Sequence, residues 1–216
     1  MGELLLSDIT RKFEKLFINN GIDDHSTLVK IHYGLEVIRN EAIKLIILFI
    51  LFSVIGSALE FVFSVLILFP LRFTSGGMHL KTNVGCFLYS LGFFILTINI
   101  LPLINAPIAL LFSLLIISAI IVISISPVES YKRPITSVDR RISMKKKSIA
   151  VFTADCIVLI LLYYFGANYY FIIGAWIVML QAIQLLATLV FRKRKGEKNV
   201  SGNQGMETVA TGGSGN

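Results

Sequence analysis

The sequence predicts an all-α, polytopic membrane protein with about six transmembrane helices, preceded by N-terminal amphipathic helices. Of its 216 residues, 55% are hydrophobic and only 15% are charged, and the mean hydropathy is +0.78. Soluble domains are about 45–50% apolar and about 25% charged. Several apolar runs also approach the roughly 20 residues that a helix needs to cross the hydrocarbon of a bilayer.

The first apolar run extends from Ala42 to Phe69 and is interrupted at Gly56–Glu60. At about 1.5 Å of rise per residue, this run is too long for one span and short for two. We therefore expect two closely linked helices. The alternative is a four-span protein in which this pair lies in the membrane or re-enters it. Four further spans are expected at Cys86–Leu101, Ile108–Ile125, Ile149–Phe165 and Tyr169–Phe191.

Basic residues lie at only one end of the predicted spans. All 20 Lys and Arg residues lie in the N-terminal part, around Arg72 and Lys81, in the loop Lys132–Lys147, or after Phe191. The turns on the opposite side contain none. Because basic loops stay in the cytoplasm, we expect a multi-pass protein of the cytoplasmic membrane. Both termini and the stretch around Arg72 would be cytoplasmic.

Three segments are expected along the chain. Residues 1–40 form a cytoplasmic amphipathic helical segment, residues 41–195 the membrane domain, and residues 196–216 a tail that is disordered or a cloning remnant. In the first segment, apolar residues recur near helical spacing with basic residues among them. Such a helix can lie on an anionic membrane surface or contact a partner or substrate helix.

A histidine and a cysteine stand seven residues apart in a polar stretch between two predicted spans. A neighbouring histidine can convert a cysteine thiol into the nucleophilic thiolate. In one straight helix, His79 and Cys86 would lie about 10 Å apart along the axis, whereas proton transfer needs about 3 Å. The pair can therefore act only if the chain breaks. Ser75, Gly76 and Gly77 supply such a break, because glycine tolerates the required backbone angles.

The start of the next helix would suit a reactive thiol. Thr82 and Asn83 can cap a helix that begins near Cys86, and the first turn of a helix presents unpaired N–H groups at the positive end of its dipole. Those N–H groups, or the glycine N–H groups before them, could hold a developing oxyanion. Spacing alone remains weak evidence, because a cysteine entering a membrane helix is usually a small apolar filler.

Positive charge flanks the pair. Arg72 and Lys81 could favour the thiolate or bind an acidic substrate. The loop Lys132–Lys147 is strongly basic and is expected to fix the orientation of the protein in the membrane. It could also attract an acidic substrate segment, an effect that salt would weaken.

Arg72 followed by SGGMHLKTNVGC resembles the signature of the AgrB-type (accessory gene regulator protein B) membrane peptidases. That signature has an Arg, a Gly-Gly-x-His, and a Cys seven residues after the His. The stretches YGLEVIRNEAIK (Tyr33–Lys44) and PVESYKRPI (Pro127–Ile135) resemble two further segments of the family. The resemblance covers roughly residues 1–195, and the number and placement of spans fit.

The resemblance implies a cysteine endopeptidase of quorum sensing. It would remove the C-terminal part of a small membrane-associated propeptide, commonly called AgrD. Cys86 would attack the scissile carbonyl, with His79 as base and then as proton donor, to give a thioester acyl-enzyme. A Cys or Ser of the substrate would then attack the thioester and release a cyclic thiolactone or lactone peptide. The alternative is a non-enzymatic transporter or membrane scaffold, with the same two side chains lining a polar site.

The resemblance also extends to the residues around the dyad. Arg72, Gly76, Gly77 and Asn83 are expected to position the substrate or hold the oxyanion, and Lys81 to bind the substrate. Matches in the basic loop add Lys132, Arg133 and Pro134 as substrate-binding candidates. We expect no cofactor, no metal and no nucleic-acid partner. The expected partners are an AgrD-like propeptide and the lipid bilayer, and a second copy of the chain is a candidate.

Among the polar residues inside the predicted spans, one is acidic and two are glutamines. An ionisable side chain at membrane depth is a functional candidate by default. Asp155 could be a third catalytic member that orients His79, pair with a cation of another helix, or lie near enough to the surface to be solvated. Gln181 and Gln184 are one helical turn apart, and such residues more often join helices by hydrogen bonds than touch substrate.

Overall fold

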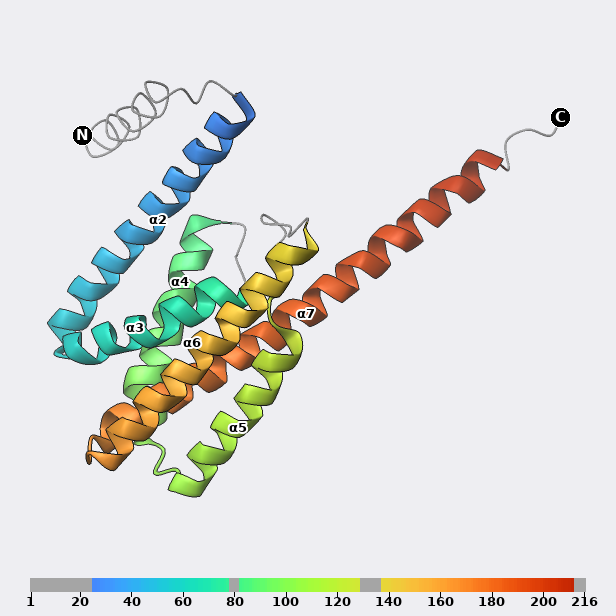
Figure 1. Cartoon of the computed structure of the whole chain (residues 1–216). Helices are drawn as coiled ribbons and strands as arrows, with labels where there is room; N and C mark the ends of the chain where they lie inside the picture. Colours follow the sequence, from blue (N-terminus) through green and yellow to red (C-terminus); the bar gives the residue numbers. More distant parts are fainter. Residues whose placement is uncertain (1–24, 78–81, 129–136, 212–216) are drawn as a thin grey trace, which may run out of the picture. The chain divides into compact units, whose positions relative to one another are not determined.

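The structure is a computed structural model that describes residues 25–77, 82–128 and 137–211. These residues contain helices and connecting turns, with no strand among them (Figure 1). The predicted all-α class is therefore confirmed. The chain divides into two compact units, Met1–Ala58 and Leu59–Asn216, and each is described by itself.

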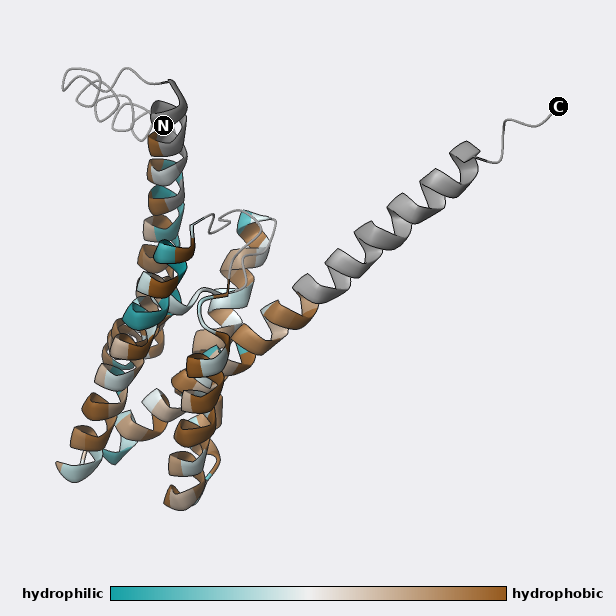
Figure 2. Cartoon of the chain, turned by 45° about the vertical axis from the view of Figure 1, so that its right-hand side comes forward, coloured by the Kyte–Doolittle hydropathy of each residue, from teal (hydrophilic) through white to brown (hydrophobic). Residues whose placement is uncertain are grey.

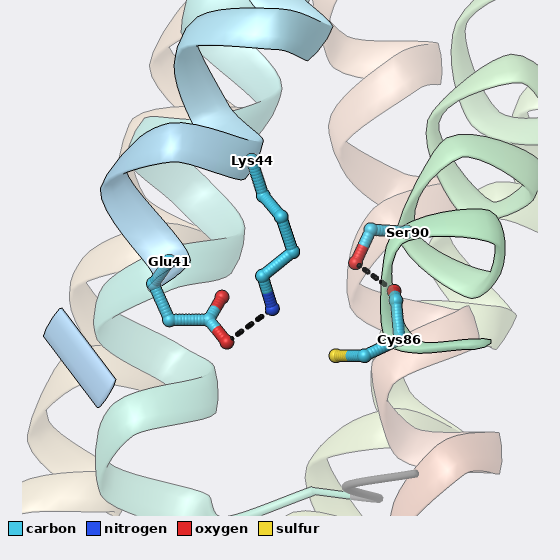
Figure 3. Close-up of polar contacts among 4 residues, drawn as sticks. All are labelled: Glu41, Lys44, Cys86 and Ser90. Carbon is cyan, nitrogen blue, oxygen red and sulfur yellow. Dashed lines mark hydrogen bonds and ion pairs between the residues drawn. The ribbon is translucent and has the colours of Figure 1, made fainter. Parts of the chain in front are cut away.

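The described part of the first unit is one long helix, α2 (His25–Ile55). It is continuous through residue 40, where the sequence predicts the start of the membrane domain. The Nζ atom of Lys44 donates a hydrogen bond to Oε1 of Glu41, one turn earlier (Figure 3). The helix ends at a turn in which Gly56 has a φ of +83°, a left-handed conformation that glycine adopts without a steric penalty. The amphipathic helix predicted before residue 24 lies outside the described residues.

The second unit contains five long helical segments and two short turns. They are α3 (Ala58–Ser75), α4 (Asn83–Ile95), the π-helical turn η1 (Leu96–Ile100), the 3-10 turn η2 (Leu101–Leu103), α5 (Ile108–Ile125), α6 (Val138–Tyr164) and α7 (Asn168–Thr211). Among the described residues of this unit, five stretches are long and apolar enough to cross a membrane. The predicted pair of closely linked helices is also present, because α2 ends and α3 begins within three residues of each other.

Helix α7 is the central helix of the second unit. Of its membrane-crossing segment, Asn168–Phe191, 56% is buried, against 22% to 39% in the other four segments. It packs against α5, α6 and η1. Its polar glutamines are therefore enclosed by protein and do not face lipid.

Aromatic pairs near the start of α7 give the directions of its neighbours. The rings of Phe63 in α3 and Tyr170 in α7 are 5.3 Å apart, and those of Phe112 in α5 and Phe171 are 5.2 Å apart. Helices α3 and α5 thus start where α7 starts. Helix α6 runs the other way, because its late residue Tyr163 also contacts Phe171, with ring centroids 5.3 Å apart.

The outer surface of the second unit is apolar. Exposed side chains on α3, α5 and α6 include Leu66, Phe69, Ile116, Ile120, Ile157 and Ile160. Figure 2 shows hydrophobic residues over much of the coloured part of these helices. An apolar surface of this extent marks contact with a membrane, so the chain is a multi-pass membrane protein.

Two helices extend beyond the spans that hydropathy predicts. Helix α6 begins at Val138, so its first three turns include the second half of the predicted basic loop. Lys, Arg and Met are good helix formers, which explains the extension. Helix α7 continues to Thr211, through the segment predicted to be a polar tail.

Candidate active site

The predicted break between two helices is present at Gly76. Helix α3 ends at Ser75, and Gly76 follows with a φ of +88°. Its N–H donates to the carbonyl of Arg72 at 3.1 Å. A left-handed glycine that satisfies a carbonyl of the last turn is a common way to end a helix. The sequence from Ser75 therefore cannot continue as one helix into α4.

Two distant segments hold this turn. The N–H of Val128, which follows α5, donates to the carbonyl of Ser75 at 2.9 Å. Nε2 of Gln181, in α7, donates to the carbonyl of Gly76 at 2.9 Å and to Oγ of Ser75 at 3.3 Å. A Cβ atom at Gly76 would overlap the carbonyl oxygen of Val128. Both its φ and its neighbours therefore require glycine here.

Gly77 lies at a different kind of contact. Its φ is not in the left-handed range, but a Cβ atom added to it would lie 3.3 Å from Nε2 of Gln184 and 3.4 Å from Cγ and Nε of Arg72. The residue is buried. The absence of a side chain thus lets the backbone of Gly77 lie close to an Arg side chain and a Gln amide.

Cys86 lies in the first turns of α4. Thr82 is the N-cap residue, and its side chain accepts a hydrogen bond from the N–H of Gly85 at 3.2 Å, as the sequence predicts. The N–H of Cys86 bonds the carbonyl of Thr82 at 3.0 Å. In a helix capped this way, the N–H groups of Asn83 and Val84 have no acceptor within the helix. The start of α4 thus keeps two backbone donors available for an anion.

The Cys86 side chain is only 8% exposed. Its carbonyl accepts a hydrogen bond of 3.0 Å from Oγ of Ser90 (Figure 3). One turn along the same face is Tyr89, whose phenol is within electrostatic reach of Arg72. Arg72 therefore connects the Gly77 turn to the face of α4 that carries the thiol.

Asp155 is buried in α6 and is 7% exposed. Among the residues that the structure describes, it makes no ion pair and its Oδ2 atom accepts no hydrogen bond. Leu159 lies against Gly174, so the antiparallel register places Asp155 near Val178, about one turn from Gln181. The solvated alternative for Asp155 does not fit this burial.

The other predicted site residues fall outside the described ranges. They are His79, Lys81, Lys132, Arg133 and Pro134. Their roles remain predictions. Within residues 25–77, 82–128 and 137–211, no three His, Cys, Asp or Glu side chains gather as metal ligands would.

The two glutamines of α7 form part of the site that hydropathy and motif spacing did not identify. Gln181 joins helices, as the sequence predicts. Gln184 does not, because neither polar atom of its amide has a hydrogen-bond partner within the described part of the chain. Their position inside an apolar span could have identified them, because burying a polar side chain in a membrane costs free energy.

The described residues combine a buried thiol, a helix N-terminus whose first N–H groups have no acceptor within the helix, and an Arg beside a glycine turn. Such an arrangement can bind a carbonyl compound and stabilise negative charge that develops on its oxygen. A thiol nucleophile beside those donors is suited to acyl transfer.

Comparison with known proteins agrees with the signature around Arg72 and Cys86. The family model described as accessory gene regulator B matches residues 8–185. A putative AgrB-like protein of Clostridium beijerinckii is 31% identical over 138 residues, which cover 62% of this chain and 67% of that protein. The accessory gene regulator protein B of Staphylococcus carnosus (strain TM300) is 29% identical over 165 residues, 75% of this chain and 83% of its own.

A further relative is the accessory gene regulator protein B of Staphylococcus haemolyticus (strain JCSC1435). It is 24% identical over 128 residues, 59% of this chain and 66% of its own. No solved structure matches the chain. Because the family model matches most of the sequence, including the stretch from Arg72 to Cys86, the chain belongs to the accessory gene regulator B family.

Proposed function

We propose that the chain is a membrane cysteine endopeptidase that cleaves the C-terminal part from an AgrD-like propeptide and promotes cyclisation of the product. Family membership supports a role in the agr quorum-sensing system. The peptidase activity rests mainly on one observation. The Cys86 thiol is buried beside the capped N-terminus of α4, and the preceding helix ends at Ser75, before Gly76 with its positive φ.

Each step of the proposed reaction has a candidate group. His79 takes the thiol proton, and the Cys86 sulfur attacks the scissile carbonyl carbon. The N–H groups at the start of α4 and the charge of Arg72 stabilise the oxyanion. The C–N bond then breaks, and His79 gives its proton to the leaving amine. The acyl group remains on the sulfur as a thioester.

Cyclisation follows if a thiol or hydroxyl of the bound peptide attacks that thioester before water does. Its sulfur or oxygen forms the new bond to the acyl carbon, and the Cys86 thiolate leaves. Exchange between two thioesters is nearly balanced in energy, so hydrolysis must be excluded. A thiol that is 8% exposed, at the end of membrane-crossing helices, supports this condition.

Three basic residues and one proline outside the described ranges complete the proposal. Lys81, Lys132, Arg133 and Pro134 are proposed to bind the acidic C-terminal segment of the propeptide. Asp155 is retained as a candidate third member that orients His79. Its burial without a charged partner in the described residues supports a functional role more than a structural one.

The test is co-expression of the chain with its propeptide, followed by mass spectrometry of the released C-terminal fragment. Cys86→Ala and His79→Ala are each expected to abolish cleavage, because each removes a group that forms or activates the nucleophile. Cys156→Ala is the matched control, since this second cysteine lies in α6, has no proposed role in the reaction and should tolerate loss of its sulfur. If both active-site variants cleave normally, the chain is a transporter or scaffold instead.

A further inference from the structure

The two glutamines of α7 differ in what their amides contact. Gln181 is fully buried, and its Nε2 holds the carbonyl of Gly76 at 2.9 Å. Gln184, one turn along α7, is 3% exposed. Within the described residues, both Nε2 and Oε1 of Gln184 lack a hydrogen-bond partner. Such an unpaired amide is unfavourable in water-free surroundings, so a structural role does not explain it.

The position of the Gln184 amide is defined by Gly77. A Cβ atom at Gly77 would lie 3.3 Å from Nε2 of Gln184 and 3.4 Å from the side chain of Arg72. This separation is closer than ordinary contact between such atoms. A side chain at residue 77 would therefore crowd the amide, and glycine lets the backbone lie close to it. Glycine is common where a ligand approaches a backbone closely.

The amide offers a donor and an acceptor side by side. One residue of an extended peptide has the same pair in complementary form on one side of its backbone: its C=O accepts and its N–H donates. A charged ligand group would not use both atoms of a neutral amide. A peptide backbone is also present in any substrate of an endopeptidase, whatever its side chains are.

We propose that Gln184 binds the backbone of one extended substrate residue, with Nε2–H donating to the carbonyl oxygen of that residue and Oε1 accepting from its N–H. This inference rests on the proposed peptidase function. Gln181, one turn earlier, fixes the turn that carries Gly77. Together the two residues make α7 one wall of the substrate site, with Gln181 supporting the wall and Gln184 contacting the substrate.

The matched pair Gln184→Met and Gln181→Met tests the division of roles, because methionine keeps the length of the side chain and removes its hydrogen bonds. Gln184→Met leaves no protein group unpaired, so the melting temperature of the purified full chain in detergent should stay the same or rise. Gln181→Met leaves the Gly76 carbonyl without this donor, and the melting temperature should fall. An equal fall in both variants would make Gln184 a structural residue.

Substrate affinity is measured in the Cys86→Ala background, so that binding is independent of cleavage. Adding Gln184→Met should weaken propeptide binding roughly tenfold, the effect of about one or two hydrogen bonds. Unchanged binding would overturn the proposal. In the cleaving enzyme, Gln184→Met should raise KM more than it lowers kcat.

Propeptides with a single amide replaced by an ester identify a backbone contact directly, because the ester lacks the N–H and is a weaker acceptor. At one position near the cut site, the ester should weaken binding to the Cys86→Ala protein but not to Cys86→Ala/Gln184→Met. If every ester has the same effect on both proteins, Gln184 does not bind the backbone. Cleavage by Cys86→Ala itself would instead refute the peptidase function, so the two failures are distinguishable.

Discussion

At the level of single residues, the site depends on two adjacent glycines, because neither carries a side chain. Gly76 adopts a φ of +88° against the carbonyl of Val128, whereas Gly77 packs closely against the side chains of Arg72 and Gln184. The first glycine is required by backbone conformation and by a neighbour. The second is required by space alone. The sequence motif Gly-Gly therefore combines two different physical requirements.

Alanine substitution should separate conformational strain from steric overlap. Gly76→Ala combines an unfavourable left-handed φ with an overlap on the Val128 carbonyl, so we expect the largest loss of melting temperature and of cleavage. Gly166→Ala has a φ of +80° but open space around it, and should cost only about 1–2 kcal/mol. Gly92→Ala, within α4 and also in open space, should be neutral. The melting temperature should be lowest for the Gly76 variant, higher for the Gly166 variant and highest for the Gly92 variant. Equal melting temperatures for the Gly76 and Gly166 variants would contradict the steric overlap at Gly76.

At the scale of helices, the packing of α6 on α7 sets the position of the glutamines. Gly174 in α7 lies against the side chain of Leu159 in α6, and Leu159 is fully buried. Small residues let membrane helices approach closely. This contact lies about 10 Å along α7 from Gln181, so it fixes the helix well away from the site itself.

A size exchange at this contact should restore packing. Gly174→Ala alone overlaps Leu159 and should destabilise the protein by about 1–3 kcal/mol, while Leu159→Ala alone leaves a cavity and should cost about 2–5 kcal/mol. In the double variant, the loss of unfolding free energy should be smaller than the sum of the two single losses by about 1 kcal/mol or more. The added methyl group can enter the space that the leucine side chain leaves. Chemical unfolding in a single detergent would measure all three, and strict additivity would contradict the contact.

At the scale of the whole molecule, one end of the second unit collects the candidate site. The C-terminal ends of α3 and α5 meet through Ser75 and Val128, and α4 and α6 begin near residues 83 and 138. The basic residues of the second unit lie at or beyond these helix ends. We therefore propose that this end faces the cytoplasm, in keeping with the preference of basic loops for that side.

Cysteine labelling tests this orientation. Ser137→Cys, before α6, should react with a membrane-impermeant maleimide only in inverted vesicles, where the cytoplasmic side is exposed. Asn105→Cys, an exposed position in the connection between η2 and α5, is the matched control and should react only in intact cells. The unsubstituted chain provides the background from its two native cysteines. Labelling of Ser137→Cys in intact cells would reverse the orientation.

The membrane class, the helix boundaries near the site and the family could all be predicted from the amino-acid sequence. These properties depend on local chemistry. Apolar runs define the spans, Gly76 can take a positive φ, Thr82 can cap a helix, and the stretch from Arg72 to Cys86 carries the signature. Each signal lies within a few residues of the feature that it predicts. Basic residues 138–147 were the main local exception, because helix propensity continued α6 into a segment expected to be a loop.

The side chains that complete the site from distant parts of the sequence could be identified only from the packing of the helices. Gln181 bonds Gly76 across 105 residues of sequence, and Gln184 reaches Gly77 with its amide still unpaired in the described residues. Hydropathy cannot supply this information, because an almost uniformly apolar helix such as α5 has no polar face to fix its rotation. Rotation and register follow from contacts such as Leu159 on Gly174, where side-chain shape, not polarity, selects one arrangement.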